Sequence, residues 1–475
     1  MKQIIVALTL AAISQISTAA PDDGATRPNV IVFMADDLGW NDVGYHGSNI
    51  KTPNIDALAA QAVQLEQFYV MPWCTATRAA FESGLNPARF GILSLQHPFP
   101  GRTALPPDLA TLPELLRRHG YFTALVGKWH LSYSFDGGPI ERGYQRAFGY
   151  LHGQMDHYTH EDQRGVTSLF RDDELISADG HMTDLIGAEL RSLLQQPGQP
   201  FFINVTFSAP HYPLQAPAQF IDANAAIENP DRRLFAGMVT HMDHVIGETV
   251  KLLESRGLLT NTIIIFLSDN GGDNYFENTR DYYGGKHGSH SIMADNSPLR
   301  GAKTDVYEGG IRVPAFIHYP AVLQPRVIDQ FTAVTDLLPT LLDFAEVEPP
   351  AQRDGGSLRP LLSGKPQVRE PEYYWFTRSV KIPHGGGKQS AVRLGNWKLI
   401  ESQRRFAWLP WRFEWPWPRF ELFDLGQDPR EQVNLARDHS DIADKLRGRL
   451  EEYRAEVFAS YPGADGKGPD AAPHD

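Results

Sequence analysis

The sequence has 475 residues with a formal net charge of −13, and 42% of them are hydrophobic and 21% charged. This composition is that of a globular protein, and the length predicts one large domain plus a smaller one. The acidic balance argues against nucleic acid as a partner, although an acidic protein can still carry a locally cationic site for an anion.

Residues 1–19 are typical of a secretory signal peptide. Met1-Lys2-Gln3 is a short basic start, Ile4 to Ile16 is apolar, and Ser17-Thr18-Ala19 supplies small residues for cleavage after Ala19. The apolar run is too short for a membrane anchor, and no later run is long enough to span a bilayer. We therefore predict an exported protein, periplasmic or secreted, without a membrane span.

The first predicted strand runs from Asn29 to Ala35 and is continuously apolar and rich in β-branched residues, as buried parallel strands are. It ends in Asp36 and Asp37. A helical pattern follows over Thr52 to Phe68.

The only cysteine, Cys74, lies in the stretch Met71-Pro72-Trp73-Cys74-Thr75-Ala76-Thr77-Arg78. Pro72 marks a turn before a helix-compatible run, so a helix that starts at Cys74 places Arg78 one turn on, on the same face. Exported proteins usually hold cysteines as disulfide pairs, and a single cysteine can form no disulfide within its own chain. Cys74 is therefore either a small buried hydrophobe or a reactive group beside a cation and the positive end of a helix dipole.

Three further predicted strands also end in polar residues: Tyr121–Val126 before Lys128 and His130, Phe201–Phe207 before His211, and Thr262–Leu267 before Asp269 and Asn270. Helical patterns alternate with them at 111–119, 182–195 and 231–256. This alternation predicts an α/β fold whose mostly parallel central sheet has helices on both faces. Ligands bind beyond the carboxyl ends of the strands in such sheets, so the polar strand ends predict a site at one edge.

The strand ends offer two kinds of chemistry. The first is a set of carboxylate and amide oxygens, from Asp36, Asp37, Asp269 and Asn270, which suits Ca²⁺ or Mg²⁺ rather than Zn²⁺. Each motif alone would be ordinary turn chemistry, but together they favour a metal site. The second is a set of cationic and imidazole side chains that could surround an oxyanion: Lys128, His130, His211 and Lys303. Taken singly, each lysine is typical of a protein surface and each histidine of a structural role.

The character of the chain changes after about Pro371. The segments 394–400 and 421–425 have the pattern of strands in a small antiparallel sheet, and a closing helix is predicted from Asp441 to Val457. We therefore expect a catalytic domain over 27–370, a C-terminal α+β subdomain over 371–460 and a disordered tail over 461–475.

These residues carry a family resemblance. Cys74-Thr75-Ala76-Thr77-Arg78 matches the Cys-x-Pro/Ala-x-Arg signature of type I sulfatases of the alkaline phosphatase superfamily, and Gly127-Lys128-Trp129-His130-Leu131 matches their second signature. The resemblance covers about 27–457. In detail, the segments 35–44 and 148–150 are most similar to arylsulfatase B-type enzymes, the N-acetylgalactosamine-4-sulfatases, and to bacterial polysaccharide sulfatases.

The resemblance implies an alkaline phosphatase-like fold and a sulfuric ester hydrolase. It implies that Cys74 is oxidised to formylglycine by a maturation enzyme, and that Asp36, Asp37, Asp269, Asn270 and residue 74 hold one Ca²⁺. The hydrated aldehyde would attack sulfur, while Lys128, Lys303 and the ion neutralise the sulfate oxygens. His211 with Lys303 would protonate the leaving oxygen, Arg78 would hold the hydrate, and His130 would take a proton so that the aldehyde reforms.

The implied substrate is a sulfated oligo- or polysaccharide, with 4-O-sulfated galactose or N-acetylgalactosamine favoured. His157, His160 and Arg164 could contact it from a loop, or could belong to a solvated loop. Trp408 and Trp411 could stack on sugar rings, or could pack the small domain onto the large one.

The residues leave three alternatives open. A phosphonate monoester or phosphodiester hydrolase can use the same modified residue. A two-metal phosphatase is disfavoured, because the sequence offers ligands for one ion only. A silent glycan-binding protein would result if Cys74 stayed unmodified. Ala76, where many members of the family have proline, leaves the identity of the maturation enzyme open.

Overall fold

The computed structural model describes residues 27–94, 105–195, 200–274, 283, 287, 290–366, 371–378, 387–404 and 418–459. The predicted signal peptide, the tail after 461, and Trp408 and Trp411 lie outside the described residues.

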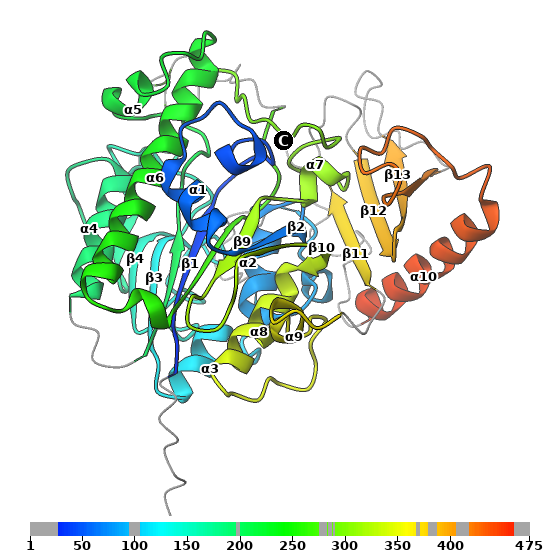
Figure 1. The fold of residues 1–475 in the computed structure, drawn as a ribbon, viewed down its shortest axis with the longest axis horizontal. Coiled ribbons are helices and arrows are strands. Elements are labelled where there is room, and N and C mark those ends of the chain that lie inside the picture. The colour runs from blue at the N-terminus through cyan, green and yellow to red at the C-terminus, as the bar shows by residue number, and fades with distance from the viewer. Residues whose placement is uncertain are drawn as a thin grey trace, which may run out of the picture.

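A ten-stranded sheet forms the centre of the molecule, in the order β10-β2-β9-β8-β1-β7-β3-β4-β5-β6 (Figure 1). Its middle strands β8, β1, β7, β3 and β4 are mutually parallel. The strands are β1 (Asn29–Ala35), β2 (Val63–Tyr69), β3 (Phe122–Lys128), β4 (Arg146–Tyr150), β5 (Leu169–Arg171), β6 (Glu174–Leu175), β7 (Phe201–Thr206), β8 (Thr262–Ser268), β9 (Ala315–His318) and β10 (Arg326–Ala333). The predicted α/β class with a mostly parallel sheet is confirmed.

Helices cover both faces of this sheet. Val30 and Val32 of β1 pack toward α2, α3, α8 and α9, whereas Ile31 and Phe33 pack toward α1, α4 and α6. The helices are α1 (Pro53–Ala60), α2 (Cys74–Ser83), α3 (Leu112–Arg118), α4 (Met182–Leu194), α5 (Ala218–Asp222), α6 (Pro230–Ser255), α7 (Glu308–Ile311), α8 (Leu337–Phe344), α9 (Arg359–Leu362) and α10 (Ser440–Ala459), with short 3₁₀ turns at Gly44–His46, Pro87–Phe90, Leu259–Asn261 and Val334–Asp336. None of the helices in the described ranges is both long and apolar enough to cross a membrane.

The helix predicted over Thr52–Phe68 is wrong in its second half. The structure ends α1 at Ala60 and begins β2 at Val63. Val63 and Leu65 are buried while Gln64 and Glu66 are half-buried, which is the two-residue alternation of a strand. No glycine or proline marks the change, so only the pairing of β2 with β10 and β9 reveals it.

A separate four-stranded antiparallel sheet follows in the C-terminal region, as predicted (Figure 1). Its strands are β11 (Glu372–Arg378), β12 (Gly387–Leu394), β13 (Trp397–Arg404) and β14 (Arg419–Asp424). The helix α10 covers its outer face, where Leu446 and Leu450 pack with Val392 and Leu399. The single strand expected over 394–400 is instead a hairpin, because Gly395 takes a φ of 59° and Leu394 pairs with Trp397.

Glu82, on α2, is a buried carboxyl whose Oε1 accepts a 2.6 Å hydrogen bond from the Tyr144 hydroxyl. Burial raises its pKa from 4.5 to about 7. Because the folded pKa lies above the unfolded one, the protonated side chain stabilises the fold at low pH, and this contribution is lost as the pH rises from about 4.5 to 7.

We expect Glu82→Gln, which cannot titrate, to abolish this dependence. Between pH 5 and 8, the unfolding free energy of the wild type should fall by about 2–3 kcal/mol relative to the variant. Urea denaturation at both pH values measures the difference, with Glu174→Gln on the exposed edge of the sheet as the matched control. A constant difference between wild type and variant at the two pH values would contradict the assignment.

Candidate active site

The carboxyl ends of β1, β3, β7 and β8 meet at one edge of the sheet. Ala35 pairs with Ser268, so Asp36 and Asp269 are neighbours just beyond the two strands. Gly127 pairs with Thr206, which brings the end of β3, with Lys128, beside the end of β7. The parallel register therefore gathers the polar strand ends that are far apart in the sequence.

Cys74 is the first residue of α2, and Trp73 is its N-cap. The thiol is buried, and its Sγ lies 3.2 Å from Nδ1 of His130. Burial raises the pKa of the Cys74 thiol, although Lys128 and Lys303 oppose the shift. The unmodified side chain is thus a neutral thiol rather than a reactive thiolate.

Arg78 lies one helical turn after Cys74, as the spacing predicted, and it is buried. Its Nη2 and Nε donate to Oδ2 of Asp269 at 2.7 and 3.2 Å, and its Nη1 donates to the carbonyl of Lys128 at 2.9 Å. The guanidinium consequently ties three elements together, namely α2, the end of β8 and the end of β3.

Two lysines pair with the two aspartates that follow β1. Lys128 Nζ lies 2.6 Å from Oδ2 of Asp36, and Lys303 Nζ lies 2.7 Å from Oδ2 of Asp37. Burial would raise the pKa of Asp37, but Lys303 and His211 outweigh it and hold the pKa at about 2. Burial lowers the pKa of Lys303, yet the carboxylate of Asp37 more than compensates and raises it overall.

His211 completes this side of the site. Its Nε2 lies 3.6 Å from Oδ2 of Asp37, while its Nδ1 lies 2.7 Å from the carbonyl oxygen of Tyr212 and donates to it. Burial and the positive charge of Lys303 lower the pKa of His211 to about 3. Since Nδ1 carries the proton, Nε2 is the bare nitrogen that faces Asp37 and Lys303.

The predicted metal ligands fit a hard cation. Oδ1 of Asp36 and Oδ1 of Asn270 are buried oxygens that have no hydrogen-bond partner among the described residues. Burial raises the pKa of Asp36, and burial with the neighbouring charge of Asp36 raises the pKa of Asp269 to about 6. Unpaired buried oxygens and mutually repelling carboxylates are the features that a bound Ca²⁺ would resolve.

The backbone at this edge has unusual geometry. Asp37 and His130 adopt left-handed φ values of 70° and 59°, which are uncommon for residues other than glycine and concentrate at functional sites. Gly127 has a φ of 121°, and a Cβ there would lie 1.9 Å from the carbonyl oxygen of Thr206. Only glycine therefore fits the position that leads into Lys128.

The structure places the predicted sugar-contacting residues less favourably. His157 and His160 are 1% and 2% exposed, and the ring of His157 stacks on His181 with centroids 4.9 Å apart. The side chain of Arg164 is 63% exposed and pairs with Asp162 at 2.6 Å. Of these three side chains, Arg164 alone reaches solvent.

Sequence reasoning missed two side chains around His130. Thr75 Oγ1 and the Tyr133 hydroxyl each lie 3.3 Å from its Nε2. The ring of Tyr133 in turn lies 5.2 Å from that of His152, which is half-buried. The proximity of Thr75 to Cys74 in the chain, and of Tyr133 to His130, was the only sequence signal for these contacts.

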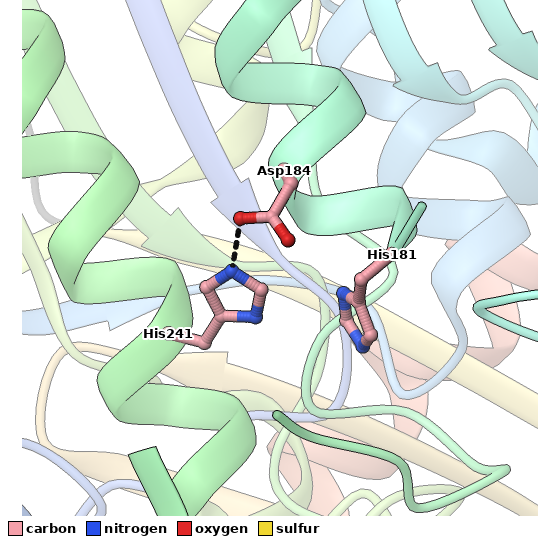
Figure 2. A group of neighbouring side chains, drawn as sticks. All are labelled: His181, Asp184 and His241. Carbon is pink, nitrogen blue, oxygen red and sulfur yellow. Dashed lines mark hydrogen bonds and ion pairs between the residues drawn. The ribbon is translucent and has the colours of Figure 1, made fainter. Parts of the chain in front are cut away.

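A second group of potential ligands lies between α4 and α6, where atoms of His181, Asp184 and His241 are within 4.8 Å of one another (Figure 2). His241 Nε2 lies 2.7 Å from Oδ1 of Asp184. His181 Nδ1 accepts from the Thr183 amide at 3.1 Å, and its Nε2 lies 3.1 Å from the Gln215 carbonyl. Because both nitrogens of His181 are already hydrogen-bonded, we assign this group to holding α4 against α6.

Comparisons with known proteins identify the family of this chain. The family model described as Sulfatase matches residues 28–347, and that described as N-sulphoglucosamine sulphohydrolase, C-terminal, matches residues 302–456. The chain belongs to the sulfatase family. It is therefore a sulfuric ester hydrolase, and the predicted family and enzyme class are confirmed.

Among curated relatives, arylsulfatase J of Mus musculus is 34% identical, covering 93% of this chain and 78% of that protein. Arylsulfatase A of Bos taurus is 30% identical, covering 92% of this chain and 87% of that protein. The crystal structure of Ps i-CgsB in complex with k-i-k-neocarrahexaose superimposes with a TM-score of 0.77 at 25% identity, covering 90% of this chain and 93% of that one. PsFucS1 sulfatase from Pseudoalteromonas sp. shares the fold, with a TM-score of 0.73 at 24% identity over 92% of this chain and 91% of that one.

Proposed function

We propose that this sulfatase removes sulfate from a sulfated carbohydrate, using residue 74 as formylglycine and one bound Ca²⁺. The observation that carries the proposal is the position of Cys74. Its side chain begins α2, lies 3.2 Å from His130 Nδ1, and shares one edge of the sheet with three buried cationic side chains, Arg78, Lys128 and Lys303.

Formylglycine, once formed from Cys74, supplies through its hydrate a hydroxyl nucleophile toward sulfur. The Sγ atom of Cys74 marks the region where those hydroxyl oxygens would stand. His130, beside it, would take up a proton as the aldehyde reforms. Burial together with the charge of Lys128 lowers the pKa of His130, so its ring is neutral before that step.

The remaining side chains divide the other roles. Lys128 and Lys303 would neutralise the sulfate oxygens, and His211 with Lys303 would protonate the leaving sugar oxygen, with the Lys303 ammonium as the source of the proton because Nε2 of His211 is unprotonated. Arg78 would hold the hydrate of residue 74, and its hydrogen bonds to Asp269 fix the guanidinium beside it. Asp36, Asp37, Asp269, Asn270 and residue 74 would hold the Ca²⁺, which supplies positive charge to the sulfate oxygens and the nucleophile.

The proposed substrate is a galactan or glycosaminoglycan bearing 4-O-sulfated galactose or N-acetylgalactosamine. Two observations support a sugar substrate. The crystallised neighbour Ps i-CgsB holds k-i-k-neocarrahexaose, and three curated relatives, 27–28% identical, carry the name N-acetylgalactosamine-6-sulfatase. The preference for position 4 rests on the similarity of residues 35–44 and 148–150 to 4-sulfatases. Export to the periplasm or medium, where such polymers are found, is part of the same proposal.

Sulfate release from defined oligosaccharides tests the substrate. We expect turnover of 4-O-sulfated galactose or N-acetylgalactosamine units to exceed that of 6-O-sulfated ones by at least about tenfold, a difference of about 1.4 kcal/mol. A parallel assay on phosphate diesters and phosphonate monoesters provides the comparison of ester type. Preference for a 6-O-sulfate would replace the proposed position, and preference for a diester would overturn the proposed substrate class.

A further inference from the structure

The segment Leu299–Ile311 carries Lys303 and is bonded on one side to the catalytic strand ends. The amide of Lys303 donates to the carbonyl of Gly272 at 3.1 Å, and the amide of Thr304 donates to that of Pro72 at 2.9 Å. The amide of Gly271 donates to the carbonyl of Gly310 at 3.0 Å. The position of Lys303 therefore depends on where this segment lies against the turns that follow β8 and precede α2.

The same segment is held on its other side by the C-terminal sheet. Thr377 of β11 bridges the two parts, because its hydroxyl accepts from Trp73 Nε1 at 2.8 Å and donates to the carbonyl of Thr304 at 3.2 Å. Trp73 immediately precedes Cys74, so one hydroxyl of the C-terminal sheet contacts both the residue before Cys74 and the residue after Lys303.

A buried group of charges lies at the end of the segment. Lys398 of β13 places Nζ 2.8 Å from Oε1 of Glu308 and 2.8 Å from Oε1 of Glu431, and all three side chains are fully buried. Glu308 begins α7, and its amide also donates to Oε2 of Glu431 at 2.7 Å. The Tyr69 hydroxyl donates to the second oxygen of Glu308 at 2.6 Å.

This group holds an arrangement rather than adding much stability. Burying three charged side chains costs about as much as their attraction returns, whereas removing one partner leaves the others uncompensated. Lys398 is the only cation within ion-pairing distance of Glu431 in the described part of the chain. Its loss would leave Glu431 without a cation and Glu308 with Arg312 alone, whose Nη1 lies 3.8 Å from Oε2 of Glu308. The segment would then have to shift to separate or rehydrate the two carboxyls.

We propose that Lys398, on the C-terminal sheet, is a positioning residue for the sulfatase reaction, because it fixes the segment that presents Lys303 to the leaving oxygen. Thr377 acts in the same direction. The inference rests on the role assigned above to Lys303. It gives the small sheet a part in catalysis that its distance in sequence from the strand-end site does not suggest.

The test compares two sulfate esters that need the leaving-group proton to different degrees. Lys398→Met should lower kcat/KM on a sugar sulfate at least about tenfold more than on 4-nitrophenyl sulfate, whose leaving group departs without a proton. Loss of folded or matured protein would lower the measured rates on both substrates by the same factor. The formylglycine content by mass spectrometry and the folded fraction by circular dichroism normalise the rates, and Lys445→Met, exposed on α10, is the matched control.

A double-mutant cycle shows whether Lys398 acts through Lys303. In protein that already carries Lys303→Ala, the Lys398→Met substitution should lower kcat/KM on the sugar sulfate by less than about twofold, because the lysine that Lys398 positions is already gone. Lys398→Arg should recover part of the wild-type ratio between the two substrates. Equal losses on both substrates, or full additivity in the cycle, would overturn the proposal.

If Lys398→Met does not fold, Thr377→Val carries the same test, because it removes one hydroxyl and keeps the shape of the side chain. Failure of the proposed function can be told apart from failure of the role of Lys398. Wild-type protein without formylglycine, or without sulfate release, would refute the mechanism, whereas an active wild type with uniform losses in the variants would refute only the role of Lys398.

Discussion

Replacing Cys74 by alanine is expected to lower sulfate release by at least about 10⁴-fold while leaving the fold intact, since loss of a covalent nucleophile typically costs on this scale. The side chain is small and buried at the start of α2, so its truncation should reduce stability only modestly. Sulfate release and thermal unfolding of the variant, side by side with wild type, measure the two effects.

Mass spectrometry of the wild-type peptide that contains residue 74 gives the complementary observation. It should show the aldehyde in protein made by a host that performs the maturation. The aldehyde content of wild-type protein is compared with that of Ala76→Pro. Proline is tolerated in the first turn of a helix and occurs at this place in the family signature. Full activity in wild-type protein that carries an unmodified thiol would refute the mechanism.

Removing the divalent ion should have the second largest effect. Dialysis against EGTA is expected to abolish turnover, and returning Ca²⁺ at about 100 times its dissociation constant should restore it and stabilise the fold by about 2.7 kcal/mol. The physical reason is that Asp36, Asp269 and Asn270 would regain a cation for oxygens that are otherwise unpaired or mutually repelling.

Asp269→Asn tests the same site from the protein side. It keeps the shape of the side chain but removes a ligand charge, so we expect the thermal shift on adding Ca²⁺ to be largely lost and kcat to fall by about 10³-fold. Asp441→Asn, exposed on α10, is the control. An unchanged Ca²⁺-induced shift in Asp269→Asn, or an equal response to Mg²⁺ in wild type, would contradict the assigned ligands or the assigned ion.

The site pairs each of its three buried aspartates with a cationic side chain. Asp36 and Asp37 each hold a lysine, and Asp269 holds Arg78. The pairs place the three cations at the edge of the sheet that holds Cys74, and they leave Oδ1 of Asp36 without a partner and free for the proposed ion. A sulfate ester entering this edge would meet preorganised positive charge, which is the arrangement that stabilises developing negative charge in the transition state.

The first sheet strand and the candidate site follow closely from local sequence. Asn29–Ala35 is the observed β1 because a run of apolar, β-branched residues buried on both faces has few other solutions. Cys74 and Arg78 share a helix face because four residues make about one helical turn. The gathering of the strand ends follows from the alternation of strands and helices, which demands parallel pairing.

Two local predictions failed for a common reason. The stretch 63–69 could be a helix or a strand by itself, and pairing with β10 and β9 made it a strand. The stretch 394–400 contained a Gly-Asn turn that sequence reasoning passed over, and pairing of β12 with β13 shows the hairpin. Short segments carry too little periodicity to choose between structures, so long-range pairing decides.

The family could be predicted from motifs of a few residues, and the α/β class from the alternation of strands and helices. The gathering of the polar strand ends around Cys74 followed from that class, because parallel strands bring their carboxyl ends to one edge. The three-dimensional structure was needed to show which lysine pairs with which aspartate, that His157 and His160 are interior, and that Lys398 of the C-terminal sheet pairs with Glu308 of α7. Those contacts join residues tens to hundreds of positions apart, and no local pattern encodes the distance between them.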